Sequence, residues 1–256
     1  MTIITLTTDF GNKDFFVPSL KGYIYSHIPS VTIVDISHQI TPFRPIEASF
    51  VLRNCYKDFP DNTIHIISIE SSQHFNDDFI LTEWEKHFFL AHNNGVISLI
   101  TDGNADKIIR LQKPVESVLF PAKEILAPAA CKLAKDFKTD DMGEPLSKLD
   151  SILSLNPVLE KDFIRGTIIY IDNYGNAITN ISRSHIDRYD KSKKPLIQFS
   201  ARDSVDKIRK HYTDVPEGET VCLYGTTGLL EISANKGNAS KLFGLSVSSR
   251  VLIEFV

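Results

Sequence analysis

Several polar residues of this sequence have the chemistry to bind a small molecule, and the first of them follow an opening β-branched run. The segment Thr7-Thr8-Asp9-Phe10-Gly11 lies between that run and a helical pattern. The carboxylate of Asp9 could accept hydrogen bonds from the two hydroxyls of a ribose, while Gly11 permits a tight turn. Asp is also common in turns and helix caps, so this segment alone leaves both interpretations open.

A second polar segment, Ile171-Asp172-Asn173-Tyr174-Gly175-Asn176, has the composition of a hairpin turn. In a functional interpretation, Asp172 would meet a cationic amino group, Tyr174 would stack on a base, and Asn176 would pair with a base edge. The Gly-bearing segments 225–233 and 235–239 are open to the same two interpretations, because loop backbone amides can hold a ligand.

The sequence does not contain the motifs of several other common types of functional site. The eight histidines do not cluster with carboxylates or thiols at metal-ligand spacing, so no metal site is expected. Nucleophile-elbow, Walker and dinucleotide-binding motifs are all missing from the sequence. The three cysteines are far apart and odd in number, which indicates free thiols in a reducing compartment: Cys55, Cys131 and Cys222.

Composition favours a globular enzyme-like protein that acts on a small molecule. The 256 residues carry a formal net charge of -4, with Lys and Arg scattered along the chain. That distribution provides no basic surface for nucleic acid or an anionic membrane. With no basic leader and no apolar run of membrane-spanning length, we expect a cytoplasmic protein.

The elements expected to position Asp9 form a βαβαβ pattern. Strands are predicted at 2–8, 31–36 and 63–70, and helices at 14–28 and 46–57. Such a pattern predicts a parallel sheet whose ligand sites lie beyond the carboxyl ends of its strands, where Asp9, Asp35 and Glu70 are found.

The remaining pattern predicts two domains. The sheet is expected to continue through 79–82, 87–92 and 96–100, and a helix at 122–136 is interrupted near Pro128. The later segments read as strands alone: 164–172, 177–181, 195–199, 220–224, 229–234 and 250–255. We therefore predict an α/β N-terminal domain, 1–158, with a mainly parallel sheet, and a C-terminal all-β barrel-like domain, 159–256.

Taken together and in order, these pieces resemble the S-adenosylmethionine (SAM) hydroxide adenosyltransferase family, which is related to the fluorinases and chlorinases. The resemblance extends over essentially the whole chain. It rests on TLTTDFGNKDFFVPSLKG at 5–22, VDISHQITPF at 34–43, FPDNTIH at 59–65, NNG at 93–95, IDNYGNAITNI at 171–181 and YGTTGLLEISANKGNA at 224–239.

The resemblance implies a homotrimer in which SAM lies between the first domain of one subunit and the second domain of its neighbour. No metal and no cofactor beyond SAM itself are implied. The implied ligand residues are Asp9 for the ribose hydroxyls, Asp14 and Phe43 beside the sugar, Asp172 for the methionine ammonium, Tyr174 and Tyr212 on either side of the adenine, Asn176 at its edge, Thr226 at the methionine carboxylate, and Asn235 and Lys236 near the adenine.

The reaction implied is displacement of methionine from the 5′ carbon of SAM by water or hydroxide, giving adenosine. The sequence departs from the family pattern where an Asp, an Arg and a His orient that water. Glu70-Ser71-Ser72 replaces Asp-Pro-Gly, the following loop carries Asp77 and Asp78 in place of Arg, and Pro121 replaces the His. Use of chloride or fluoride is not supported by these residues.

Three functions therefore stay open. The first is SAM hydrolysis, with Glu70 as the carboxylate and His74 or Lys123 positioning the water. The second is binding of SAM or adenosine without catalysis. The third is cleavage of SAM by another nucleophile. His74 is also readily explained as a solvated loop residue.

Overall fold

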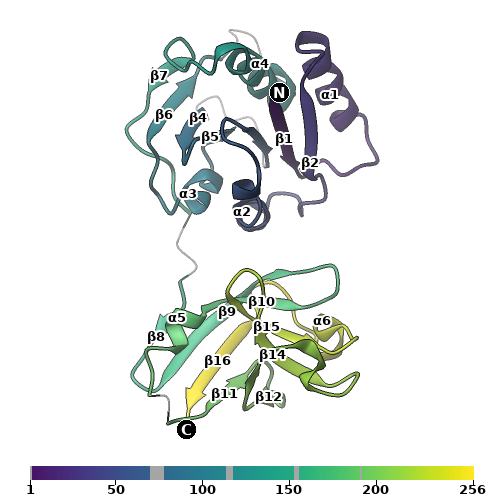
Figure 1. The fold of residues 1–256 in the computed structure, drawn as a ribbon, viewed down its shortest axis with the longest axis vertical. Helices are drawn as coiled ribbons and strands as arrows, with labels where there is room; N and C mark the ends of the chain where they lie inside the picture. The colour runs from purple at the N-terminus through teal and green to yellow at the C-terminus, as the bar shows by residue number, and fades with distance from the viewer. Residues whose placement is uncertain (1, 70–77, 114–117, 153–155, 191) are drawn as a thin grey trace. The chain divides into compact units, whose positions relative to one another are not determined.

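The computed structural model describes residues 2–69, 78–113, 118–152, 156–190 and 192–256. The chain divides into two compact units, Met1–Ser154 and Leu155–Val256. Figure 1 follows their elements along the chain. In the described part of the chain, no helix is both long enough and apolar enough to cross a membrane.

The first unit contains a mixed sheet in the order β2-β1-β3-β5-β4-β6-β7. Its strands are β1 (Ile3–Thr8), β2 (Thr32–Ser37), β3 (Ile64–Ser68), β4 (Phe79–Trp84), β5 (His87–His92), β6 (Lys107–Leu111) and β7 (Gly143–Pro145). The pairs that join β2, β1, β3 and β5 are parallel, whereas those that join β5, β4, β6 and β7 are antiparallel.

The prediction of a mainly parallel sheet was therefore wrong beyond β5. The reason is local. Glu85 and Lys86, which connect β4 to β5, have φ angles of 46° and 65°. Two consecutive residues with positive φ form the tight turn that fits an antiparallel hairpin, so this connection is too short for the crossover that a parallel pair needs.

Helices cover both faces of this sheet, as Figure 1 shows. The helices are α1 (Phe16–His27), α2 (Pro45–Arg53), α3 (Val96–Ile100) and α4 (Ala127–Asp136), with a 3-10 helix at Tyr56–Asp58 and a π-helical turn at Ala122–Leu126. Alternate residues of β5 point into two separate cores: Phe88 and Leu90 pack with α1 and α4, and Phe89 and Ala91 pack with α2 and α3. The central strands β1, β3 and β5 are rich in apolar residues because both of their faces are buried.

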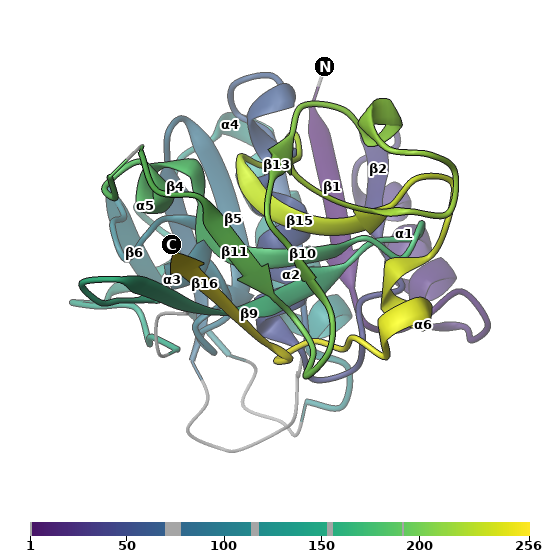
Figure 2. The same ribbon diagram turned by 90° about the horizontal axis from the view of Figure 1, so that it is seen from below.

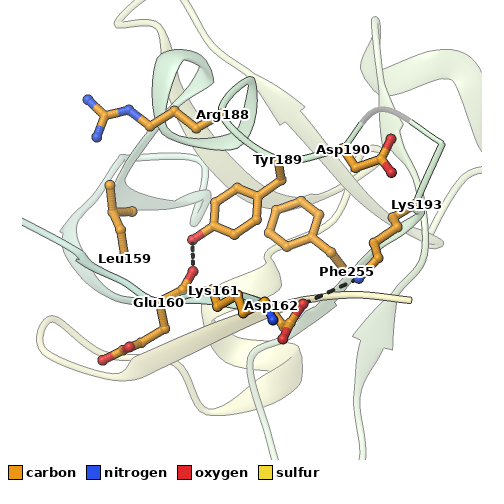
Figure 3. Close-up of a pocket in the computed structure, with 9 residues that line it drawn as sticks. All are labelled: Leu159, Glu160, Lys161, Asp162, Arg188, Tyr189, Asp190, Lys193 and Phe255. Carbon is orange, nitrogen blue, oxygen red and sulfur yellow. Dashed lines mark hydrogen bonds and ion pairs between the residues drawn. The ribbon is translucent and has the colours of Figure 1, made fainter.

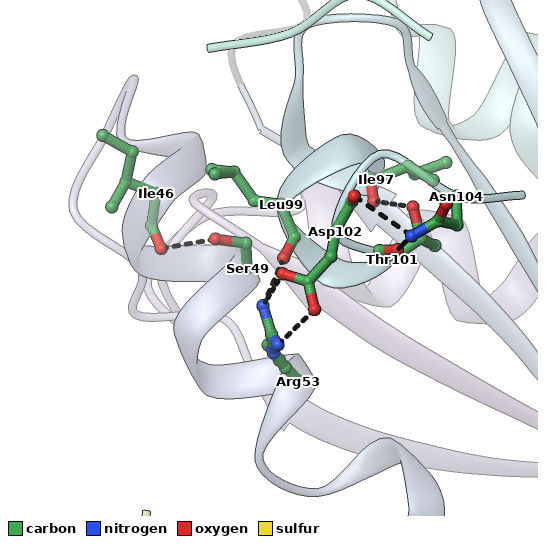
Figure 4. A network of polar contacts seen from close by, with 8 residues as sticks. All are labelled: Ile46, Ser49, Arg53, Ile97, Leu99, Thr101, Asp102 and Asn104. Atoms are coloured by element: carbon green, nitrogen blue, oxygen red, sulfur yellow. Dashed lines mark hydrogen bonds and ion pairs between the residues drawn. The ribbon is translucent and has the colours of Figure 1, made fainter. Parts of the chain in front are cut away.

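Segment 96–100, expected to extend the sheet, is the helix α3. Gly95 precedes it with a φ of 90°, a left-handed conformation that redirects the chain. The helix presents Val96, Ile97 and Ile100 to the core. Figure 4 shows how its far end is tied to α2: Arg53 donates two hydrogen bonds of 2.6 Å to the carboxylate of Asp102.

The second unit is an almost barrel-shaped sheet in the order β12-β11-β16-β9-β10-β15-β14-β13, with β8 paired to β9. The strands are β8 (Val158–Leu159), β9 (Phe163–Ile171), β10 (Ala177–Ser182), β11 (Pro195–Gln198), β12 (Ser204–Val205), β13 (Ile208–Arg209), β14 (Thr220–Tyr224), β15 (Leu229–Ala234) and β16 (Arg250–Phe255), accompanied by α5 (Arg183–Ile186), a 3-10 helix at Tyr212–Asp214 and α6 (Ala239–Phe243). The long strand β9 pairs first with β16 and then with β10, and Figure 2 shows it after a turn of 90° from the view of Figure 1.

Candidate functional site

In the first unit, the loops that follow β1 and β2 are hydrogen-bonded to each other. The backbone N–H of Phe43 donates to Oδ2 of Asp9 at 3.1 Å. The N–H of Gly11, which has a φ of 69°, donates to the carbonyl oxygen of His38 at 2.7 Å. The structure thus brings together Asp9 and Phe43, two residues that the sequence assigned to one sugar pocket.

A chain of polar side chains connects to this pair of loops, and we call it the His38 network. It consists of Thr8, His38, Asp35 and Lys21. Thr8 Oγ1 lies 2.8 Å from Nδ1 of His38, and Nε2 of His38 lies 3.0 Å from Oδ1 of Asp35. Lys21 Nζ lies 2.5 Å from Oδ2 of Asp35. Burial acts to raise the pKa of Asp35, but its contacts with Lys21 and His38 hold that pKa below its ordinary value.

Lys123 lies in the π-helical turn and donates a hydrogen bond of 3.0 Å from Nζ to the hydroxyl of Ser19 in α1. The nearby ring of Phe120 packs edge-on against Phe10 and Phe16, with ring centroids 5.6 and 5.2 Å apart. Because Phe10 directly follows Asp9, this aromatic cluster places the Lys123 segment beside the loop after β1.

The other predicted residues of the first unit are Asp14, Glu70 and His74. Asp14 is exposed in the bend before α1. Glu70 and His74 lie outside the described residues, as does Asp77. Asp78 is paired with Arg110 of β6, with 2.8 Å between Oδ1 and Nε.

In the second unit, Asp172 organises the turn between β9 and β10. Its Oδ1 accepts hydrogen bonds of 2.9 Å from the backbone N–H groups of Tyr174 and Asn176, and its Oδ2 accepts one of 2.8 Å from the side-chain amide of Asn176. Gly175, at a φ of 86°, packs so closely on Asn238 that an added Cβ would lie 2.2 Å from it. Hairpin-turn chemistry is therefore present, and it gathers three predicted ligand residues.

Tyr212 is brought to the same place by a buried partner. Its hydroxyl donates a 2.8 Å hydrogen bond to Oε2 of Glu231 in β15, and Glu231 is only 6% exposed. Burial, followed by the negative charge of Asp172, raises the pKa of Glu231 despite the hydrogen bond from Tyr212. Burial and the same two carboxylates raise the pKa of Tyr212. Two carboxyl groups, those of Asp172 and Glu231, therefore lie close enough to Tyr212 to affect its pKa.

The last three predicted ligand residues lie in loops of the second unit. Thr226 is exposed in the turn between β14 and β15. The side-chain amide of Asn235 donates to the carbonyl of Val215 at 2.8 Å, and Lys236 pairs with Glu217 at 2.9 Å. Asn235 thus secures the loop that follows Tyr212, while the Lys236 side chain points to a surface partner.

A hollow of about 420 Å³ in the second unit does not contain any of the predicted ligand residues. Figure 3 shows its lining: Leu159, Glu160, Lys161, Asp162, Arg188, Tyr189, Asp190, Lys193 and Phe255. The rings of Tyr189 and Phe255 stack at 4.0 Å, and the Tyr189 hydroxyl donates to the carbonyls of Glu160 and Phe163. These contacts account for the positions of Tyr189 and Phe255 in the wall of the hollow.

Comparison with known proteins identifies the family. A model of the SAM hydroxide adenosyltransferase N-terminal domain matches residues 4–143, and one of the C-terminal domain matches residues 166–252. The chain belongs to this family. The resemblance seen in the sequence motifs is thereby confirmed.

Individual relatives match along most or all of the chain. A (R)-S-adenosyl-L-methionine hydrolase from Methanocaldococcus jannaschii is 27% identical over 99% of this chain and 96% of that protein. A fluorinase from Actinoplanes is 22% identical over 73% of this chain and 74% of that protein. The crystal structure of an uncharacterized conserved protein from Thermotoga maritima matches with a TM-score of 0.88 and 26% identity over 98% of this chain and 99% of that one.

Two residues of these regions were missed by sequence reasoning. His38 was noted only as part of the segment VDISHQITPF. Its contact with Thr8 spans 30 positions, so no local pattern reveals this contact. Glu231 had a signal that could have been used: it is a charged residue flanked by Leu230 and Ile232 in the predicted strand LLEISA. Among the described residues, no three His, Cys, Asp or Glu side chains are placed to hold a metal ion.

Proposed function

We propose that this protein hydrolyses SAM to adenosine and L-methionine. The observation that carries the proposal is that both family domains match in order, and that relatives named as SAM hydrolases match end to end. In the reaction, a water oxygen bonds to the 5′ carbon while the C5′–S bond breaks. The bonding electrons pass to sulfur, the sulfonium becomes the neutral thioether of methionine, and the water loses a proton.

For the sugar, we assign Asp9 to the ribose hydroxyls, with Phe43 and Asp14 beside the ring. A carboxylate can accept hydrogen bonds from both hydroxyls of a diol. The contact between Phe43 N–H and Asp9 Oδ2 supports this assignment because it fixes the carboxylate relative to the aromatic side chain.

For the amino-acid end of SAM, we assign Asp172 to the ammonium group and Thr226 to the carboxylate. A carboxylate has about four acceptor sites, and the turn uses three of those on Asp172. The buried carboxyl of Glu231 nearby supports the assignment, because a second acidic group beside Asp172 makes this surface more attractive to a cation.

For the adenine, we assign Tyr174 and Tyr212 to its two faces and Asn176 to its edge, with Asn235 and Lys236 completing the contacts. The exposed ring of Tyr174 and the hydrogen-bonded ring of Tyr212 support these roles, since stacking needs an accessible aromatic face. The active form proposed is a homotrimer whose sites use residues of two subunits. Light scattering on the purified protein tests the trimer.

For the attacking water, we assign Glu70 as the carboxylate and His74 or Lys123 as the positioning group. The sulfonium is already a good leaving group, so alignment and desolvation of the water account for much of the catalysis required. Pro121 stands where the family pattern has a His, which favours the second candidate, a SAM-binding protein without catalysis.

The deciding experiment incubates the protein with SAM in water enriched in the heavy oxygen isotope and follows products by mass spectrometry. Hydrolysis predicts methionine and adenosine carrying the heavy oxygen at its 5′ hydroxyl. Added chloride should yield no 5′-chloro-5′-deoxyadenosine. SAM binding without turnover would support the second candidate, and Glu70→Gln with unchanged turnover would remove Glu70 from the mechanism.

A further inference from the structure

We propose that His38 is a positioning residue, and that the His38 network holds Asp9 in the orientation that receives the ribose hydroxyls. The inference rests on the proposed function, because it deepens the role of Asp9 in that site. No contact between His38 and the ligand is required.

His38 holds the loop after β1 at two points, one on each side of Asp9. Its imidazole Nδ1 contacts the Thr8 hydroxyl at 2.8 Å, immediately before Asp9. Its backbone carbonyl accepts the N–H of Gly11 at 2.7 Å, two residues after Asp9. A single residue of the loop after β2 therefore fixes the backbone on both sides of the carboxylate.

The charges in the network indicate where its protons lie. Asp35 carries a lowered pKa and lies 3.0 Å from Nε2 of His38, so the imidazole proton is expected on Nε2. Nδ1 then has a lone pair and accepts the proton of the Thr8 hydroxyl. The Thr8 oxygen is left to accept the backbone N–H of Phe10 at 3.4 Å. Lys21 fixes the far oxygen of Asp35 and completes the orientation of the ring.

Thr8, His38 and Asp35 have the side-chain types of a hydrolase triad, but the burial of Thr8 and His38 excludes that role. Thr8 is 0% exposed and His38 is 5% exposed, so the hydroxyl cannot reach a substrate carbon. The network must act through the backbone that it orders. The functional side chain on that stretch of backbone is the carboxylate of Asp9.

The sequence offers a closely matched pair of variants to test this role. Thr8→Val removes the hydroxyl that bonds to His38 while keeping the shape of the side chain. Thr7→Val makes the same change one position earlier in β1, where the side chain is also 0% exposed and the hydroxyl has no hydrogen-bond partner among the described residues. Any effect of removing a buried hydroxyl from this strand in general appears in both variants.

The ligand comparison uses adenosine and 2′,3′-dideoxyadenosine, which lacks both ribose hydroxyls, in calorimetric titrations. Because one neutral hydrogen bond is lost, Thr8→Val should weaken adenosine binding about three- to tenfold and leave dideoxyadenosine binding unchanged. Thr7→Val should change neither affinity. Equal losses for both nucleosides, or the same change in Thr7→Val, would overturn the positioning role.

A second pair of variants identifies the essential contact of His38. His38→Asn places an amide near the position of Nδ1, so it can still accept from Thr8. His38→Gln places its amide near the position of Nε2 and loses the contact with Thr8. We expect His38→Asn to retain more of the preference for adenosine than His38→Gln, and the reverse order contradicts the network.

Hydrogen exchange in the ligand-free protein separates failure of this inference from failure of the proposed function. The amides of Phe10 and Gly11 should exchange several-fold faster in Thr8→Val than in Thr7→Val, whether or not adenosine binds. Unchanged exchange overturns the inference. If the two variants differ in exchange as expected but the wild-type protein shows no preference for the ribose diol, the His38 network is present and the role assigned to Asp9 is refuted.

Discussion

The loop after β1 and the turn after β9 both present a carboxylate, but contacts of very different range hold them. Asp9 is fixed by Phe43, 34 positions away, and by the link from Thr8 to His38, 30 positions apart. Asp172 is fixed by residues two and four positions along its own turn. The first arrangement depends on the packing of two strands, whereas the second is determined largely within its own segment.

Burial opposes the charged form of ionisable groups in both units, and one buried group in each unit illustrates this. His65 of β3 is buried against His87 and Thr5, with hydrogen-bond distances of 3.1 and 2.7 Å. Burial, followed by the charge of His87, lowers the pKa of His65 to about 3. In the second unit, burial raises the pKa of Glu231. His65 therefore stays neutral well below pH 6.5. Glu231 keeps its proton to a higher pH than an ordinary glutamate.

The largest expected effect is therefore a contrast between the units on acidification. A histidine with a lowered pKa stabilises the fold above its ordinary pKa near 6.5, and that contribution is lost as pH falls toward 3, by about 1.4 kcal/mol per pH unit. The raised pKa of Glu231 has the opposite sign, since its contribution is present at low pH and is lost as pH rises. The first unit should unfold first in acid.

The single tryptophan, Trp84 of β4, reports on the first unit through its fluorescence. His65→Gln should flatten the pH dependence of the Trp84 unfolding transition between pH 6 and 4 (roughly the range set by the pKa change). His27→Gln, at an exposed position of α1, is the control. An identical acid transition in His65→Gln and wild type contradicts the role given to His65.

The next effect concerns the close approach of Gly225 to Glu231 in the second unit. An added Cβ at Gly225 would lie 1.7 Å from Oε1 of Glu231. Gly225→Ala should displace that carboxylate and destabilise the protein by about 3 kcal/mol. Gly22→Ala is the matched change in α1, where a Cβ meets nothing within 4 Å, and it should stabilise by up to about 1 kcal/mol. Urea unfolding measures both, and equal effects would refute the steric argument.

A smaller effect should separate the two tyrosines assigned to the adenine. Tyr212→Phe removes the hydrogen bond to Glu231 and should cost about 2 kcal/mol of unfolding free energy, because the acceptor is a buried carboxylate. Tyr174→Phe changes a side chain that is 76% exposed and should have almost no effect on stability. Both variants keep their rings, so calorimetry should show that adenosine binding depends more on Tyr212 than on Tyr174.

The smallest expected effect is at the ion pair that joins α2 to α3. Arg53 and Asp102 form a well-aligned pair, but their side chains are 47% and 65% exposed. Arg53→Ala should therefore cost about 0.5 kcal/mol, and added salt should reduce that difference. A loss of several kcal/mol in urea unfolding would show that this long-range contact is as important as the buried ones.

Particular segments show how far local pattern predicts this fold. The runs at β1, β2 and β3 were found because their β-branched residues and flanking turns are local signals. The run at 96–100 was misread, because five apolar residues fit a strand or a helix equally, and Gly95 and the facing surface of α2 decide between them. The antiparallel half of the sheet was missed although a local feature begins it, because the two-residue turn at Glu85 and Lys86 carries no Gly or Asn to mark its positive φ angles.

The sequence by itself determined the family, the two kinds of domain architecture and the segments that carry the predicted ligand residues, because these depend on local motifs and periodicity. It also determined the Asp172 turn, whose hydrogen bonds join residues at most four positions apart. Only the tertiary structure decided that His38 contacts Thr8 beside Asp9 and that Glu231 accepts a hydrogen bond from Tyr212. Those pairs form when distant strands pack together, and burial then sets their hydrogen bonds and the pKa of Glu231.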